Sequence, residues 1–319
     1  MTATFPEPRS AATDVDERRS AAYDYALPAE LVAQEPAPIR DASRLMVVRA
    51  DAIDDAVFAD LPRYLRAGDL LVLNETRVIP ARLIGNRVPS GGRAELLLLH
   101  PAHALRYRSD ALHWIALARP ARRLRDGARI AFGDGAEAVV RAVLPDGARE
   151  VEFALREPFE RFLHRVGQLP LPPYVRDDSA EARRGYQTVF ARVPGSVAAP
   201  TASLHFTETL LGNVEAMGVE VARIVLDVGL GTFRPMTADR IDDHRMHAES
   251  YAISAAAACA IAEARRANRR IVAAGTTVVR ALEDNIQKYG AIVAGEERTS
   301  LFITPGFTFR VVDAMITNF

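Results

Sequence analysis

The middle of the chain, residues 77–155, is built from short apolar runs and contains no convincing helix. The runs read AELLLL, HWIALA, ARIAF, EAVVRAVL and REVEFAL. The turns that separate them contain glycine and read SGG, DG, DG and PDG. Evenly spaced strands with such turns predict a compact antiparallel β-barrel.

The flanking segments, 21–76 and 156–319, mix strand and helix patterns. Their predicted elements are strands over 45–48, 70–73, 219–228, 271–274, 301–304 and 309–316, and helices over 207–217, 255–266 and from 276 through about 288. This order predicts an α/β sandwich into which the barrel is inserted. The polar residues 1–20 predict a disordered N-terminal tail.

Charge and composition exclude several kinds of protein. Forty basic and 41 acidic residues give a net charge of -1, so any RNA contact must be a local patch. Lys288 is the only lysine and Cys259 the only cysteine, which argues against a P-loop and excludes a disulfide framework. Without a long apolar stretch or a signal peptide, we expect a cytoplasmic protein.

A glycine pair follows the β-branched segment IVLDV. Gly229 and Gly231 leave room for close approach of an adenosyl or phosphate group, as in nucleotide-binding loops of methyltransferases. However, Phe233 stands where a third glycine would allow helix packing, and Pro235 stops the expected helix. A simple connecting turn is the alternative.

Histidines appear in two further motifs. His205 follows small residues in PTASLHFT and lies shortly before a helix, where it could transfer a proton or serve as a structural cap. In DDHRMHAESY, His244 and His247 could hold a metal on one helix face, but no third ligand is identifiable. Proton transfer or hydrogen bonding to a hydroxylated substrate by His247 and Glu249 is therefore favoured over metal binding, and no metal is predicted. A solvated loop histidine is the alternative.

The motif GTT opens a predicted helix after a strand. Its amides, with the hydroxyls of Thr276 and Thr277, suit a carboxylate, phosphate or ribose, and Arg280 follows one turn later. The alternative makes the threonines ordinary N-caps and Arg280 with Glu283 an exposed pair.

Arginines crowd one part of the barrel segment and suggest a phosphate-binding patch. They are Arg119, Arg122, Arg123, Arg125 and Arg129.

Ordered stretches from Tyr23 to Phe319 resemble the S-adenosylmethionine:tRNA ribosyltransferase-isomerase family of queuosine biosynthesis. They read YDYALPAELVAQEP, RDASRLMVV, GDLLVLNETRVIPARL, LPLPPY, GYQTVFA, APTASLHFT, VGLGTFRPM, MHAESY, GTTVVRALE and PGFTFRVVDAMITNF. The resemblance implies the same sandwich with an inserted barrel. It also implies transfer and isomerisation of the ribosyl group of S-adenosylmethionine onto 7-aminomethyl-7-deazaguanine at the tRNA wobble position, giving epoxyqueuosine, adenine and methionine.

On this resemblance we assign roles to the residues singled out above. The predicted catalytic residues are His205, His247 and Glu249. The predicted S-adenosylmethionine-binding residues are Gly229, Gly231, Thr232, Arg234, Thr276, Thr277 and Arg280. The predicted tRNA-binding residues are Arg119, Arg122, Arg123 and Arg125. S-adenosylmethionine is expected as co-substrate without a further cofactor, metal, membrane or obligate protein partner, in a monomer.

Three residues depart from the family pattern: Ser203 replaces a glycine, Asp227 a histidine and Glu75 an aspartate. The family continues beyond the position of Phe319, which predicts that the main domain is truncated and that activity is affected. A binding-only relative and a methyltransferase therefore stand as alternatives. Release of adenine, absence of product or formation of S-adenosylhomocysteine distinguishes the three.

Overall fold

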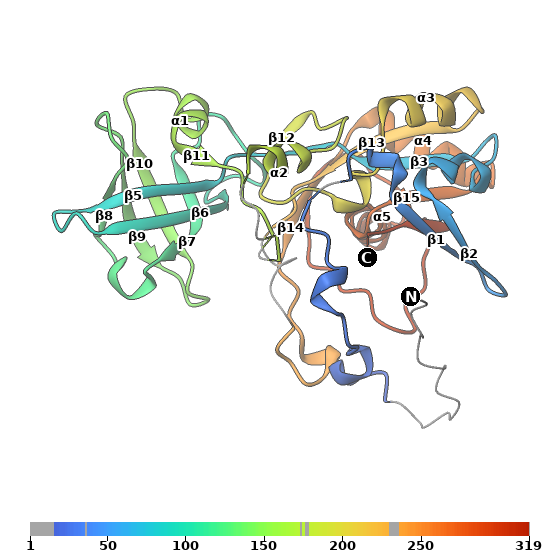
Figure 1. Ribbon diagram of the computed structural model, residues 1–319, viewed down its shortest axis with the longest axis horizontal. Coiled ribbons are helices and arrows are strands. Elements are labelled where there is room, and N and C mark those ends of the chain that lie inside the picture. Colours follow the sequence, from blue (N-terminus) through green and yellow to red (C-terminus); the bar gives the residue numbers. More distant parts are fainter. Residues whose placement is uncertain (1–15, 36, 173, 176–178, 230–235, 319) are drawn as a thin grey trace.

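The computed structural model describes residues 16–35, 37–172, 174–175, 179–229 and 236–318 (Figure 1). A barrel lies at one end of the molecule and a helix-covered sheet at the other. The predicted class, an α/β sandwich with an antiparallel barrel, is confirmed. None of the described helices is long and apolar enough to cross a membrane.

The barrel closes through six antiparallel strands in the order β5-β6-β7-β10-β9-β8, with β8 pairing back to β5. They are β5 (Arg82–Val88), β6 (Arg93–Pro101), β7 (His113–Arg119), β8 (Arg129–Ala131), β9 (Glu137–Val143) and β10 (Arg149–Ala154). Side chains alternate across the wall: in β7, Trp114 is fully buried whereas His113 faces outward and is partly exposed. This alternation fills the barrel with apolar side chains.

The barrel core extends past the predicted boundary at residue 155. Strand β11 (Gly167–Gln168) pairs with β5, and helix α1 (Phe159–Val166) packs Phe159 and Phe162 into the barrel core. An apolar helix face meets the open end of the barrel here, so the helix contributes to the same core as the strands.

The main sheet has the order β16-β14-β13-β3-β15-β17. Its strands are β3 (Leu70–Asn74), β13 (Glu220–Leu226), β14 (Glu249–Ile253), β15 (Ile271–Ala274), β16 (Gly295–Thr299) and β17 (Ala314–Ile316). Strands β13, β3, β15 and β17 run parallel to one another. Strand β14 runs antiparallel to β13, and β16 runs antiparallel to β14. The four parallel strands therefore end at one edge of the sheet.

Helices cover both faces of this sheet. Leu70 and Val72 share a core with α4 (Ala255–Arg266) and α5 (Thr276–Tyr289). Leu71 and Leu73 share another core with α3 (Glu208–Ala216) and the 3-10 helix η4 (Phe58–Tyr64). Each fully buried leucine stabilises the fold by about 1.5–3 kcal/mol, which explains the unbroken apolar run of β3.

Polar side chains cap the beginnings of two helices, and a glycine follows the end of one. Ser254 accepts a hydrogen bond from Ala257 N at the start of α4, and the Thr207 side chain accepts one from Leu210 N at the start of α3. Each such cap stabilises a helix by about 1 kcal/mol. Gly218 after α3 has φ 86, a conformation that favours glycine.

Smaller elements complete the chain. They are the hairpin β1 (Arg44–Val48) and β2 (Ile53–Val57), the parallel pair β4 (Thr76–Val78) and β12 (Val193–Ser196), helix α2 (Ala180–Gly185), and the 3-10 helices η1 (Ser20–Tyr23), η2 (Ala29–Leu31), η3 (Arg40–Ala42), η5 (Ala121–Arg123), η6 (Thr201–Ser203) and η8 (Ile241–Asp243).

The last residues of the predicted N-terminal tail form backbone hydrogen bonds with residues 239–241. Ser20 N donates to Asp239 O at 3.0 Å, and Ile241 N donates to Arg18 O at 2.9 Å. The blue and orange segments accordingly lie side by side in Figure 1. Residues 1–15, the rest of the predicted tail, lie outside the described residues.

Two predicted strands near the C-terminus are wrong in whole or in part. Residues 301–304 form no strand, and only Ala314–Ile316 of the predicted 309–316 does. In the second of these segments, the Glu283 carboxylate accepts hydrogen bonds from the amides of Arg310, Val311 and Val312. Those amides are therefore not available to a strand ladder.

Candidate active site

Segments far apart in the sequence meet at the carboxyl edge of the parallel strands. Asp227 follows β13, Gly275 follows β15 and Asn318 follows β17. Strand β14 runs in the opposite direction, so it begins at this edge, with Glu249. It lies next to Asp227, because the Asp227 amide donates a hydrogen bond to Ser250 O at 2.8 Å. Ligand sites of α/β sheets are found outside this edge.

A cleft of about 200 Å³ lies between this edge and the barrel. Its lining residues come from both parts of the molecule: Leu99, His100, Pro101, Leu105, Arg106, Tyr107, Ile115, Asp146, Gly195, Asp227, Gly229, His247, Ala248, Glu249, Ser250 and Arg298. Three residues predicted from sequence, Gly229, His247 and Glu249, are brought together here. The predicted residues Gly231, Thr232 and Arg234 lie outside the described residues.

Glu249 is a buried side chain of the cleft, and both of its carboxylate oxygens have partners. It is only 5% exposed, and its Oε1 accepts a hydrogen bond from Gly229 N at 2.8 Å. Its Oε2 forms an ion pair with Arg280, which also donates from Nε to Leu301 O at 2.9 Å. Because both charges are buried, removing either partner leaves an unpaired charge at a cost of about 3–5 kcal/mol.

Two alternatives raised for the GTT motif are wrong. Arg280 and Glu283 do not form an exposed pair, because both are buried and bind other groups. Gly275, with φ 101, is the N-cap of α5, so Thr276 and Thr277 lie within the helix. Thr277 Oγ1 is buried and has no hydrogen-bond partner in the described part of the chain. The predicted ligand contacts of both threonines and of Arg280 stay predictions.

Asp227 joins the two domains through Arg106 of the loop after β6. It accepts hydrogen bonds from Arg106 Nε at 2.9 Å, Arg106 Nη2 at 3.3 Å and Thr76 Oγ1 at 3.0 Å. Burial raises the pKa of the Asp227 carboxyl, while Arg106 and Thr76 act against the shift. Sequence reasoning noted Asp227 only as a family departure and missed Arg106, since nothing local distinguishes this arginine from the many others.

The barrel side of the cleft supplies mostly uncharged groups. Burial lowers the pKa of His100, although its hydrogen bond to Pro101 O opposes this. Burial and the nearby Glu160 raise the pKa of Tyr107 to about 12. Both side chains are therefore neutral near pH 7, and the Tyr107 hydroxyl is a donor.

The histidine pair His244 and His247 does not share a helix face. His244 follows η8 and packs against the Phe302 ring at 5.0 Å between centroids, whereas His247 lies in an extended segment and lines the cleft. The predicted absence of a metal there stays a prediction.

His205 lies elsewhere on the carboxyl edge. Its Nδ1 is 3.0 Å from Ser43 Oγ and its Nε2 is 2.9 Å from Asn318 Oδ1, and its ring lies 5.3 Å from that of Phe58. It is not among the described lining of the cleft. Its predicted catalytic role stays a prediction.

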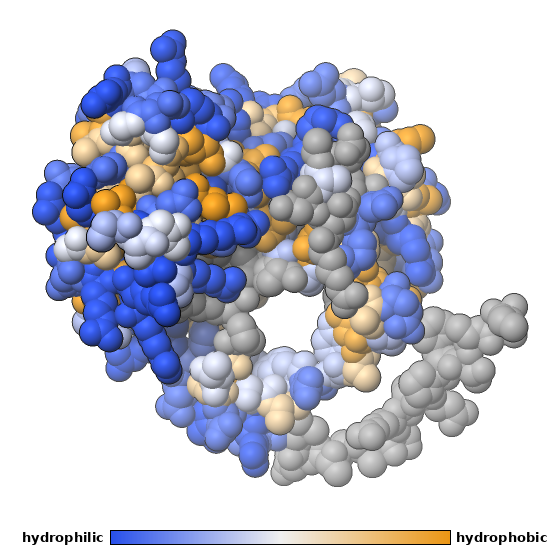
Figure 2. All heavy atoms as spheres, turned by 60° about the vertical axis from the view of Figure 1, so that its left-hand side comes forward, coloured by the Kyte–Doolittle hydropathy of each residue, from blue (hydrophilic) through white to orange (hydrophobic). Residues whose placement is uncertain are grey.

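The predicted tRNA-binding arginines lie on the barrel at the end of β7, in η5 and shortly after η5. Arg119, Arg122, Arg123 and Arg125 are exposed, and none forms an ion pair with a described acidic residue. Figure 2, in which the barrel side comes forward, shows a largely hydrophilic surface. Arg119, the first arginine of this patch, lies about 13 Å along β7 from the cleft residue Ile115. One folded RNA can therefore reach both the patch and the cleft.

Comparison with known proteins identifies the family. The chain matches the family described as queuosine biosynthesis protein over residues 20–319. It belongs to this family. The curated S-adenosylmethionine:tRNA ribosyltransferase-isomerases of Moorella thermoacetica and Symbiobacterium thermophilum are 48% and 50% identical to it over 301 residues, covering 93% of this chain and 86% of each relative.

A solved structure is also similar to this member of the family. The S-adenosylmethionine tRNA ribosyltransferase of Thermotoga maritima is 31% identical, and the match covers 95% of this chain and 84% of that one with a TM-score of 0.46. The predictions of the family and of an enzyme are confirmed by the curated relatives. The methyltransferase alternative is not supported.

Proposed function

We propose that the chain transfers and isomerises the ribosyl group of S-adenosylmethionine onto 7-aminomethyl-7-deazaguanine at the tRNA wobble position. The products are epoxyqueuosine in tRNA, adenine and methionine. The observation that carries this proposal is the 48–50% identity, over 93% of the chain, to relatives named for the same transfer and isomerisation.

The charges of the cleft suit a sulfonium substrate. Its described lining contains three carboxylates, Asp146, Asp227 and Glu249, and two guanidinium groups, Arg106 and Arg298. Carboxylates attract the positive sulfonium and ammonium groups and accept hydrogen bonds from ribose hydroxyls. The carboxylates of this cleft are therefore the expected seat of the ribosyl part of S-adenosylmethionine.

The size of the cleft indicates that S-adenosylmethionine extends beyond it. A volume of about 200 Å³ is below the roughly 300–1,000 Å³ of typical small-molecule sites. Neighbouring strands lie about 4.8 Å apart, so the ends of β13 and β15 are separated by about 10 Å. An extended S-adenosylmethionine spans this distance, with its ribose at Glu249 and its far end at Thr276.

Ribosyl transfer requires proton transfer beside a positive sulfur. The sulfonium acidifies the C5′ proton, a base removes it, and the resulting ylide drives the loss of adenine. The substrate amine then captures the opened sugar, and methionine leaves after isomerisation. His247 and Glu249, which line the cleft, are the proposed groups for the proton transfers of isomerisation. His205 is proposed to exchange a proton farther along the edge.

The remaining predicted residues have binding roles in this proposal. Gly229, with Gly231, Thr232 and Arg234 after it, is assigned to the adenosyl and ribose portion. Thr276 and Thr277 are assigned to the methionine carboxylate or a substrate hydroxyl. Arg280 acts through Glu249, because its guanidinium is committed to that carboxylate.

Binding of tRNA is assigned to the exposed arginines of the barrel. Arg119, Arg122, Arg123 and Arg125 are exposed and form no ion pair with a described acidic residue, so they offer positive charge for phosphates. We further propose a cytoplasmic monomer that needs no obligate protein partner and uses no cofactor besides its co-substrate.

The decisive assay combines the protein, S-adenosylmethionine and tRNA carrying the precursor base. Release of adenine together with ribosylated tRNA supports the proposal. S-adenosylhomocysteine would instead indicate methyl transfer, and tRNA binding without any product would indicate a binding-only protein. Unmodified tRNA with guanine at the wobble position is the matched control.

A further inference from the structure

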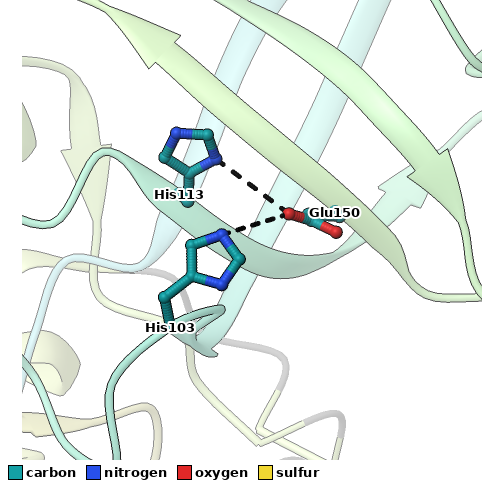
Figure 3. A group of neighbouring side chains, drawn as sticks. All are labelled: His103, His113 and Glu150. Carbon is teal, nitrogen blue, oxygen red and sulfur yellow. Dashed lines mark ion pairs between the residues drawn. The ribbon is translucent and has the colours of Figure 1, made fainter.

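Two histidines and a glutamate meet on the outer face of the barrel (Figure 3). His113 opens β7, Glu150 lies in β10 and His103 lies in the loop after β6. Glu150 Oε1 is 3.5 Å from His103 Nε2 and 4.0 Å from His113 Nδ1. One donor atom from each of the three side chains lies within 4.8 Å of the others.

The register of the barrel fixes two of these three positions. His113 pairs with Glu152 across the strands, and Glu150 pairs with Ile115. All four residues therefore share the outer face, since Trp114 and Val151 between them point inward and are buried. The His113 and Glu150 side chains are held close by the β-ladder itself.

The surroundings of His113 are those of a metal ligand. Its Nδ1 is buried, faces Glu150 and has no hydrogen-bond partner within the described chain. On the other side of the ring, Glu152 Oε1 lies 3.8 Å from Nε2, and Arg141 Nε holds Glu152 at 2.5 Å. Metal-binding histidines commonly have such a carboxylate behind the ring, because it fixes the tautomer and orientation.

We propose that His103, His113 and Glu150 bind one Zn²⁺ ion. Two imidazoles and a carboxylate are a common ligand set for zinc, with a fourth position open to water. With zinc–ligand distances near 2.1 Å, tetrahedral ligand atoms lie about 3.4 Å apart. The 3.5 Å between His103 and Glu150 already fits, and rotation of the 68% exposed His103 side chain can bring its donor atom closer to that of His113. The 4.0 Å between His113 and Glu150 requires a small rotation of the Glu150 side chain, which is 26% exposed.

Zinc at this site would fasten the loop that forms one wall of the cleft. The loop, residues 102–112, carries Arg106 and Tyr107, which line the cleft, and Arg106 binds Asp227 of the main sheet. A metal ligand at His103 lies three residues before Arg106. The ion therefore has a structural role beside the cleft, and the inference does not rest on the proposed reaction.

Co²⁺ titration of the untagged full-length protein tests this site without any activity assay. Trp114, the only tryptophan, is adjacent to His113 in sequence, so Co²⁺ bound here should quench its fluorescence. We expect saturation at one equivalent, with visible d–d absorption of a tetrahedral or five-coordinate ion, and displacement of Co²⁺ by Zn²⁺ but not by Mg²⁺.

Matched variants separate this site from other ligands. His103→Ala and Glu150→Gln should each weaken Co²⁺ affinity about tenfold or more, whereas His164→Ala, which removes an exposed histidine of α1, should not. The Cys259→Ser background removes the thiol that lies 3.7 Å from Glu263 Oε1. The loop variant His103→Ala carries little risk to folding.

Two results would overturn the inference. One is the absence of Trp114 quenching when the wild-type protein is titrated with Co²⁺. The other is equal Co²⁺ affinity in wild type, His103→Ala and Glu150→Gln, which would leave the trio as two histidines paired with a carboxylate.

Discussion

The two ends of the carboxyl edge carry different chemistry. At the β13 end, Glu249 is buried and Asp227 is largely buried, and arginines and backbone hold the two carboxylates. At the β17 end, His205 is only partly buried and is held by neutral partners, Ser43 and Asn318. The fold places its strongly desolvated charges beside the barrel, so the site of ribosyl binding is expected there, with His205 in a supporting position.

Glu249→Gln is expected to have the largest effect on activity. The change removes the carboxylate from the cleft and leaves the charge of Arg280 unpaired. We expect kcat/KM to fall about a thousandfold and stability to fall by about 3 kcal/mol. Steady-state adenine release and denaturant unfolding measure the two effects.

A double variant separates the two roles of Glu249. In Glu249→Gln/Arg280→Met both charges of the buried ion pair are removed, so stability should recover in large part while activity stays low. Recovery of activity along with stability would show that Glu249 serves only the fold.

His205→Ala tests the opposite end of the edge. If His205 transfers a proton, kcat should fall about a hundredfold. His205→Gln retains hydrogen-bonding capacity toward Ser43 and Asn318, so it should restore folding but not turnover. Full activity of the glutamine variant would assign His205 to structure alone.

Sequence reasoning predicted the helices and strands that a local pattern of residues specifies. The buried run 70–73 and the helix Ala255–Arg266 both depend on neighbouring residues, and both are confirmed. The strand Gly295–Thr299 was missed because this edge strand is polar and charged. Its sequence, GEERT, lacks the apolar alternation by which strands are recognised.

The site could be predicted only in part for a similar reason. Gly229, His247 and Glu249 lie in short motifs and meet in the cleft, as the family pattern implied. Arg106 became visible only through its contact with Asp227, 121 residues later in the chain. A cross-domain ion pair leaves no local signature in one sequence.

Asp227→Asn is expected to have a moderate effect. The Arg106 contact between barrel and sheet weakens, and we expect kcat/KM to fall about tenfold, or about 1.4 kcal/mol. Because burial raises the pKa of Asp227, its carboxylate protonates earlier on acidification than a free aspartate. Protonation of Asp227 should therefore lower the activity of the wild type as the pH falls. This contribution to the decline should be absent in Asp227→Asn.

The same raised pKa has a defined sign for stability. Folding favours the protonated form of Asp227, so its contribution to stability is largest below about pH 4 and falls as the pH rises through its folded-state pKa. Unfolding free energies of wild type and Asp227→Asn across this range test the sign. An opposite slope would contradict the burial argument.

Asp69→Asn is the control with the smallest effect on activity. Asp69 lies at the opposite end of the sheet, directly before β3, and binds Arg270 and Arg66. Burial would raise its pKa, but the hydrogen bonds and charge of these arginines outweigh burial and lower it. We expect kcat to stay unchanged while stability at pH 7 falls by about 1.5–3 kcal/mol.

The pH dependence of this control follows from the lowered pKa. The stabilisation by Asp69 is present above its ordinary pKa of about 4 and is lost as the pH falls through the folded-state value. The difference in unfolding free energy between wild type and Asp69→Asn should therefore shrink in acid. A loss of kcat in this variant would mean that the two ends of the sheet are coupled.

The most direct test of the central claim is a crystal structure of the protein with S-adenosylmethionine. We predict ribose hydroxyls within hydrogen-bond distance of Glu249, the adenosyl group against Gly229, and the methionine end directed toward Thr276. An adenosyl group bound away from both Gly229 and Glu249, for example against the barrel arginines, would contradict the account.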